Sequence, residues 1–446
     1  MKRTLLIILL FIIVYSDNLL SQSGIDYPEF EKKLLPFFAE ELISDIPKQL
    51  PMGSRFTVWG WDVGDFSGDE VNDLAFTVKL ALEKKRIVQV YLFVDIDGFL
   101  EKVSQFSYEY FELPLEIGIV IKDNSCFVTQ KKKEFDWKID GFRYENGSIF
   151  LIDNFATFRF NNYTREAYRN YYTLFNTDKI YITRNGKGIF QTNYLTIPSY
   201  SRGKLLYHPY NTDAVANSIE YVHKGAYYWK GEDDASFSVK SAYCDEYLYF
   251  TVDIRDDKLV FPKCDTCIGD YLELWFDLNS PDSTGGRFFN LKKDSISLNN
   301  KIKKGIYCIK LYPGNFYDKR AFVKEISTSD DVETYQQDAV NSLKVTSSLK
   351  DKGFELKFKI PFNFLGFESH PINGKNPFEI GCTLVFIDID SEWRPEEEKQ
   401  IATSAFSQAN PSTFGSLVLI PFNKWYGNAH NIYVNDIQKH LIDYGF

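Results

Sequence analysis

The stretch from residue 243 to residue 279 limits the fold of this chain more than any other part of it. Apolar and polar side chains alternate over Tyr247–Ile254 and again over Tyr271–Leu278, and an acidic loop joins the two runs. Successive side chains of a strand point to opposite faces, so a period of two residues predicts strands that bury one face. Two such strands joined by a carboxylate-rich loop predict a β-sandwich whose rim offers oxygen ligands to a cation or a small polar ligand.

Short alternating runs recur along most of the chain, and turn signals separate them. Asp97-Gly98 and Asn146-Gly147 each stand between two such runs, where these dipeptides are typical of tight hairpins. Aromatic residues make up 17% of the chain, and they favour the half-buried surface of a sheet. A codon bias toward these residues would explain their excess equally well. We therefore expect an all-β protein with a C-terminal β-sandwich, preceded by a second β-rich domain.

An interrupted helix is expected near the N-terminus, with a helical turn at Pro361–Leu365 and a short helix in the tail after Trp425. Apolar residues between positions 24 and 50 recur mostly at spacings of three and four, and Pro47 and Pro51 end the pattern. Pro36 lies inside this pattern and predicts a kink or a break.

The first residues have the pattern of a secretory signal peptide. Lys2 and Arg3 precede the apolar run Leu5–Val14, and small serines follow. The run is too short for a comfortable membrane span. We expect a signal peptide over 1–22, a β-rich domain over 23–205, the sandwich over 206–422 and a tail over 423–446. The protein is then secreted or periplasmic.

The net charge limits which partners the chain can bind, and the cysteine positions limit which disulfides it can form. The net charge of −10 opposes a phosphate backbone, so nucleic acid is not an expected partner. Of the six cysteines, Cys264 and Cys267 form a C-x-x-C between two expected strands. A disulfide within this loop is the favoured interpretation, and the other pairings stay open.

A first candidate metal loop lies between residues 62 and 73. Oxygen-bearing groups recur at alternate positions, and Gly68 accommodates the sharp turn. Calcium binds six to eight oxygens of a tightly wound loop. The segment resembles the calcium loop of FG-GAP/VCBS-type repeats, although it has Glu70 where that pattern has a second glycine. The alternative is an Asp-capped hairpin turn. The expected ligands are Asp65, Ser67, Asp69, the Val71 carbonyl and Asp73.

Three motifs in the C-terminal half occur in a specific order. They are L-Y-x-x-V-x-I-x-D-D and D-x-L-E-L-x-F-D at 248–277, I-G-x-x-L-x-F-x-D-x-D at 380–390, and P-S-x-F-G-x-L-x-L at 411–419. In this order they resemble family 9 carbohydrate-binding modules. The resemblance implies a DOMON-like sandwich with structural calcium and a slot that clamps a sugar between two aromatic rings.

The residues of the sugar slot agree with that family only in part. Glu273 matches a polar position that contacts the sugar. Where the family has its two tryptophans, this chain has Cys267 and Gln408. Trp393, with Arg394 beside it, is the expected replacement stacking residue, unless it anchors a loop on the sandwich edge. Trp275 shares a face with Glu273, which is either a ligand face or a second packed face of the sheet.

The acidic loop supplies a second candidate cation site. Asp256, Asp257 and Asp270 are its expected calcium ligands, and the alternatives are turn caps and solvated charges. No nucleophile motif such as G-x-S-x-G occurs, so catalysis is not expected.

The sequence thus predicts an exported, non-catalytic protein that binds a polysaccharide or glycan, with calcium-stabilised loops. The alternatives are a structural protein that has lost sugar binding, or a participant in glycoside hydrolysis. The oligomeric state stays open.

Overall fold

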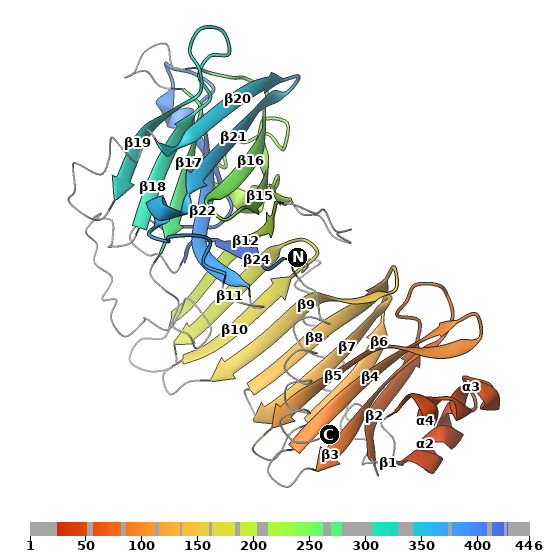
Figure 1. Cartoon of the computed structure of the whole chain (residues 1–446). Helices are drawn as coiled ribbons and strands as arrows, with labels where there is room; N and C mark the ends of the chain where they lie inside the picture. Colours follow the sequence, from red (N-terminus) through yellow and green to blue (C-terminus); the bar gives the residue numbers. More distant parts are fainter. Residues whose placement is uncertain are drawn as a thin grey trace. The chain divides into compact units, whose positions relative to one another are not determined.

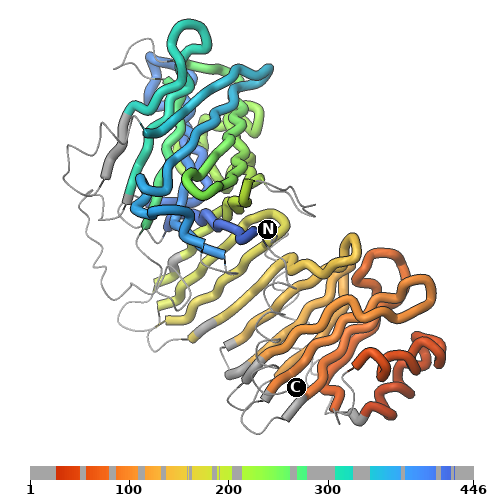
Figure 2. The backbone as a smooth tube through the Cα atoms, viewed as in Figure 1, coloured from red at the N-terminus to blue at the C-terminus, as the bar shows by residue number. Residues whose placement is uncertain are grey.

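A computed structural model describes most of the chain. The described residues are 25–50, 57–81, 86–110, 116–133, 136–159, 163–182, 188–202, 213–261, 269–278, 306–328, 342–372, 377–407, 413–422 and 426. The chain divides into two compact units, the first formed mainly by residues up to Phe190 and the second by Thr173–Thr177 and Gln191–Tyr426. Figure 2 follows the chain from the red helices and yellow strands of the first unit to the green and blue strands of the second.

Three short helices open the first unit and lie beside its first strands (Figure 1). They are α2 (Tyr27–Leu34), α3 (Glu40–Ser44) and α4 (Ile46–Gln49). The break between α2 and α3 contains Pro36, which confirms the expected interruption. Phe30, Ile43 and Ile46 are fully buried against strand residues of the sheet beneath them.

The strands of the first unit form antiparallel meanders. One sheet has the order β1-β2-β3-β4-β5, and β6, β7, β8, β9 and β10 pair in succession. The bounds are β1 (Ile25–Asp26), β2 (Thr57–Gly64), β3 (Asp73–Ala81), β4 (Arg86–Ile96), β5 (Phe99–Tyr110), β6 (Glu116–Lys122), β7 (Ser125–Lys133), β8 (Asp136–Glu145), β9 (Ser148–Arg159), β10 (Tyr163–Asn170) and β11 (Phe175–Ile182). Strand β12 (Gly188–Ser201) belongs to the second unit from Gln191 onward. A buried cluster that includes Val90, Phe106, Ile119 and Phe142 joins the two sets of strands.

Two hairpin turns were expected and both are present. Asp97 and Gly98 have φ angles of 54° and 83°, and Asn146 and Gly147 have 51° and 77°. These left-handed values are those of the tight turns that match strand twist. The sequence pattern predicts no strands over residues 161–200, but β10, β11 and most of β12 lie there. Their polar side chains hide the alternation, because both faces carry Tyr, Arg, Asn or Thr.

The second unit is a two-layer β-sandwich, with β15, β16, β21 and β20 in one layer and β19, β18, β17 and β22 in the other (Figure 1). Strand β24 pairs with both β12 and β22. The bounds are β13 (Ala214–Ala216), β14 (Val222–Lys224), β15 (Ala235–Tyr243), β16 (Tyr247–Asp256), β17 (Tyr271–Asp277), β18 (Ile306–Tyr312), β19 (Phe322–Thr328), β20 (Lys344–Lys350), β21 (Gly353–Pro361), β22 (Phe378–Asp388), β23 (Lys399–Ala402) and β24 (Ser416–Ile420). Single helical turns are η1 (Ile219–Tyr221), η3 (Phe362–Leu365) and η4 (Pro395–Glu397).

The sandwich buries apolar side chains on two levels. Its main core lies between the layers and includes Phe237, Val252, Phe276, Leu356 and Leu384. A second cluster covers the other face of β17 and β22 and includes Trp275, Val385, Phe406 and Phe414. The all-β fold class with a short N-terminal helical segment is therefore confirmed.

Several sequence predictions fall outside the described residues. They are the signal peptide, the Cys264–Cys267 loop, Gln408, the boundary at 205/206 and most of the tail. Among the residues that the structure does describe, no helix has the length and apolar character needed to cross a bilayer.

Candidate functional site

The candidate site lies at one end of the sandwich, where β16, β18, β20 and β22 finish. The antiparallel pairings also place the first residues of β15, β17, β21 and β23 at this end. We call it the loop end, and define it by the segments 225–234, 257–261, 313–321 and 389–398. Because it joins segments from both layers, it brings together side chains that are far apart in sequence.

Three buried carboxylates meet at the loop end. Asp256 ends β16, Asp388 ends β22 and Asp270 stands just before β17, and none is more than 3% exposed. One oxygen of each lies within 4.8 Å of an oxygen of the other two. Asp270 accepts hydrogen bonds from the Val260 N–H (2.6 Å) and the Ile389 N–H (2.9 Å). This carboxylate therefore holds two loop-end segments, 257–261 near its end and 389–398 at its start.

Some oxygens of these carboxylates have no hydrogen-bond donor among the described residues. Oδ2 of Asp256 and Oδ1 of Asp388 accept no hydrogen bond from that part of the chain. Burial raises the pKa of Asp256 to about 6 and, with the charge of Asp256, that of Asp388 to about 8. Burial and the charges of Asp256 and Asp388 raise the pKa of Asp270 well above its usual range. Three ionised carboxylates this close and this dry need protons or a cation to offset their charge.

One lysine enters this acidic region from β23. The ammonium of Lys399 is fully buried and lies 2.7 Å from Asp388, 2.8 Å from Asp234 and 2.9 Å from Asp390. Asp257 is exposed, and with Asp234 and Asp390 it forms a second group whose oxygens lie within 4.8 Å of one another. The predicted ligand Asp257 therefore belongs to a different carboxylate group from Asp256 and Asp270.

Three aromatic rings project from the loop end into solvent. Tyr227 and Tyr317 are each 93% exposed and Trp393 is 89% exposed. They belong to three different segments, before β15, between β18 and β19, and after β22. Arg394 is paired with Glu397 at 3.1 Å. A single exposed ring is ordinary, but three exposed rings on loops at one end of the sandwich are a candidate contact surface.

The predicted pair Glu273 and Trp275 has different surroundings from Trp393. Trp275 is 3% exposed, and its ring lies 5.6 Å from that of Phe406 and 6.2 Å from that of Phe414. Its indole N–H donates to Glu273 at 2.8 Å. Of the two interpretations, the packed second face describes this geometry, because other side chains cover the ring. A ligand contact by Glu273 or Trp275 stays a prediction.

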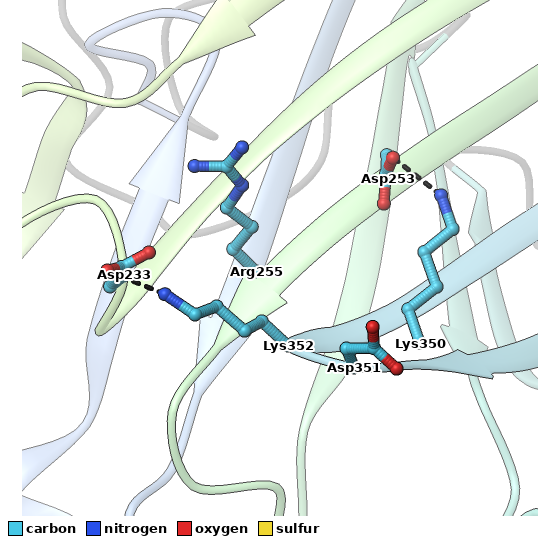
Figure 3. A pocket seen from close by; sticks show the side chains of 6 residues that line it. All are labelled: Asp233, Asp253, Arg255, Lys350, Asp351 and Lys352. Atoms are coloured by element: carbon cyan, nitrogen blue, oxygen red, sulfur yellow. Dashed lines mark hydrogen bonds and ion pairs between the residues drawn. The ribbon is translucent and has the colours of Figure 1, made fainter.

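A charged pocket of about 480 Å³ also opens at this end (Figure 3). It is lined by Asp233, Asp253, Arg255, Lys350, Asp351 and Lys352. Lys350 pairs with Asp253 at 2.6 Å and Lys352 with Asp233 at 3.0 Å. These ion pairs are well exposed, so each contributes little to stability.

The loop of the first unit between β2 and β3 holds its carboxylates differently. Asp73 is fully buried and accepts hydrogen bonds from the N–H groups of Phe66, Ser67 and Asp95. Asp65 accepts from the N–H groups of Gly68 and Glu70. The Asp69 carboxylate accepts from the Val71 N–H. These bonds are those of the Asp-capped turn, and calcium binding by this loop stays a prediction.

Sequence reasoning found Asp256 and Asp270 but not their partners. Asp388 and Asp390 were visible as an Asp-x-Asp at the end of a strand, in a motif that was used for the fold alone. Asp234 and Lys399 carry no signal of their own in the sequence, because only the pairing of distant strands brings them to this end.

The fold and the loop end define an all-β protein whose sandwich combines a buried carboxylate centre with exposed aromatic rings. The chain is similar to a family 9 carbohydrate-binding module from Caldicellulosiruptor kristjanssonii in complex with cellotriose, with 14% identity and a TM-score of 0.31 over 51% of this chain and 95% of that one. It is also similar to that organism's family 9 module in complex with glucose, with 16% identity and a TM-score of 0.30 over 52% and 98%. A scan against protein-family models and a search of curated proteins give no match.

Proposed function

We propose that this protein is an exported, non-catalytic protein that binds a polysaccharide or glycan at the loop end, with calcium held by the buried carboxylates. The observation that carries the proposal is the set of exposed rings, Tyr227, Tyr317 and Trp393, gathered on loops at one end of the sandwich. The apolar C–H faces of a pyranose stack on aromatic rings, and nearby charged groups bond its hydroxyls. The three sequence motifs that resemble family 9 modules support the same ligand class.

The donor set at the loop end fits calcium. Asp256, Asp270 and Asp388 are hard oxygen donors, and the unsatisfied oxygens of Asp256 and Asp388 remain for an ion to bind. Calcium there would offset the buried charge and fix the segments that Asp270 bonds, 257–261 and 389–398. It would hold the Trp393 loop in place without contacting the sugar.

Export is the second part of the proposal, and it rests on the N-terminal pattern of Lys2, Arg3 and the apolar run that follows. The mass of the protein recovered from outside the cytoplasm should lack about the first 22 residues if a signal peptidase removes them. Recovery of the full-length chain from the cytoplasm would contradict export.

Sugar binding is tested with Trp393→Ala on a glycan array, followed by titration of the glycan that binds. Loss of one stacking ring should weaken binding by ~1–2 kcal/mol or more, roughly tenfold, while stability stays within ~0.5 kcal/mol because the ring is exposed. Phe422→Ala is the matched control, since Phe422 is 56% exposed and follows β24, which ends at the opposite end of the sandwich. If the folded wild-type chain binds no saccharide, the alternative of a structural protein without sugar binding replaces this proposal.

A further inference from the structure

Lys399 is the one described lysine with no exposed surface at the loop end, and its ammonium uses every donor it has. Its three neighbours come from three parts of the chain: Asp388 ends β22, Asp390 lies two residues further on, and Asp234 precedes β15. An ammonium has three N–H donors, and three carboxylates lie within 2.9 Å of this one. No other contact is needed to satisfy it.

The carboxylates around Lys399 could also bind a metal ion. Asp234, Asp257 and Asp390 have oxygens within 4.8 Å of one another, a spacing that one cation spans. The ammonium of Lys399 lies within 2.9 Å of carboxylate oxygens of Asp234, Asp388 and Asp390, and its charge offsets the repulsion among them.

We infer that Lys399 is a built-in counter-ion that takes the place of a second metal ion at the loop end. It holds the segments 225–234 and 389–398 together whether or not calcium is bound. The inference extends the calcium part of the proposed function, but it does not require calcium to bind the wild-type chain.

The two segments that Lys399 joins are those that carry Tyr227 and Trp393. They also touch through the backbone, since a Cβ added at Gly225 would lie 2.3 Å from the Glu398 carbonyl oxygen. The segment 257–261 is held differently, by the Asp256 and Asp270 carboxylates. Removal of calcium should therefore loosen 257–261 and the Ile389 amide, which Asp270 bonds, and leave 225–234 and 389–398 joined through Lys399.

The test is Lys399→Met in the full chain, because methionine keeps most of the apolar stem and removes the charge. Calcium titration by calorimetry, repeated with terbium luminescence, counts the ions bound per chain. We expect the variant to bind about one ion more than the wild type, since Asp234 and Asp390 lose their internal cation and share a cation-sized space with Asp257. An unchanged count in a folded variant would overturn the inference. If the wild type binds no calcium, the proposed calcium site at Asp256, Asp270 and Asp388 is refuted. The difference in ion count between the variant and the wild type still tests the role of Lys399.

A second variant covers the case in which Lys399→Met does not fold. The triple variant Lys399→Met, Asp234→Asn, Asp390→Asn removes the repulsion together with the lysine, and it should fold and bind no extra ion. If the single variant unfolds in EDTA but folds with calcium, or if only the triple variant folds, the lysine acts through its charge. If single and triple variants are equally unfolded, packing explains Lys399 and the inference fails.

Hydrogen exchange supplies an independent measurement. In wild-type protein treated with EDTA, we expect faster exchange at the amides of Val260 and Ile389, which Asp270 bonds, and unchanged exchange at Lys230 and Asp234. In Lys399→Met treated the same way, Lys230 and Asp234 should exchange faster as well. Equal protection at Lys230 and Asp234 in both proteins would overturn the inference.

Discussion

Asp388→Asn should remove a large part of the pH dependence of stability that the sandwich has without calcium. Burial first, and then the charge of Asp256, raises the pKa of Asp388 from its ordinary 3.8 to about 8. Between these two pH values the coupled carboxylates Asp256, Asp270 and Asp388 of the folded chain keep a proton that the unfolded chain releases. The contribution of this group to stability in EDTA is therefore greatest below about pH 4, falls between about pH 4 and about pH 8, and is constant above that.

The size of this fall follows from the two pKa values. Each pH unit over which the folded state holds the extra proton costs ~1.4 kcal/mol, so the four units from 3.8 to about 8 set an upper limit of ~6 kcal/mol. Coupling to Asp256 and Asp270 shares this cost among the three groups, and a loss of ~2–4 kcal/mol between pH 5 and pH 8 is the expected observation. Asparagine cannot ionise, so Asp388→Asn should flatten this slope and be the more stable protein at pH 8 in EDTA.

Urea unfolding between pH 5 and pH 8, followed by tryptophan fluorescence, to which the buried Trp275 contributes, measures both proteins with and without calcium. At a calcium concentration 100 times the dissociation constant, the wild type should gain ~2.7 kcal/mol. Asp388→Asn should gain clearly less, because one charged carboxylate ligand becomes a neutral amide oxygen. Asp253→Asn is the control, since Asp253 lies on the same strand β16 in an exposed pair with Lys350 and should change stability by under ~1 kcal/mol. A wild type whose stability in EDTA is flat from pH 5 to pH 8 would refute the reasoning.

Two further substitutions test hydrogen bonds of the two units. Trp275→Phe keeps most of the buried ring but removes the N–H that donates to Glu273. It should lower the free energy of unfolding in urea by ~1–3 kcal/mol. A loss below ~0.5 kcal/mol would mean that this hydrogen bond contributes nothing measurable. Asp73→Ala leaves three N–H groups of the β2–β3 loop without their acceptor and should cost ~2–4 kcal/mol in calcium-free buffer. Asp69→Ala is its exposed counterpart and should cost under ~1 kcal/mol, so equal losses would contradict the turn geometry.

What the sequence predicted well is decided within a few neighbouring residues. Asp97-Gly98 and Asn146-Gly147 adopt left-handed conformations that these residues tolerate, so hairpins could be placed before any strand pairing was known. Pro36 interrupts the N-terminal helix because its ring and missing N–H act on the adjacent turn. The alternation of residues 243–279 gave two strands, β16 and β17, and an acidic loop between them.

What the sequence left open depends on contacts between distant segments. The alternation of the sequence places Trp275 on one face of β17. Whether this face is buried depends on the packing of Phe406 and Phe414, which only the tertiary structure shows. A lysine at the start of a strand is usually solvated, whereas the register that pairs Lys399 with Asp388 turns it inward.

The carboxylates near the acidic loop show most clearly which features local sequence predicts and which depend on tertiary structure. Local sequence identified Asp256 and Asp270, because carboxylates flanking two strands are visible in the chain itself. The third buried carboxylate, Asp388, comes from another strand of the second layer, and Asp234 and Lys399 come from two more segments. The pairing of strands across the sandwich determines which carboxylates are buried close together. Their mutual repulsion arises only once that packing has formed.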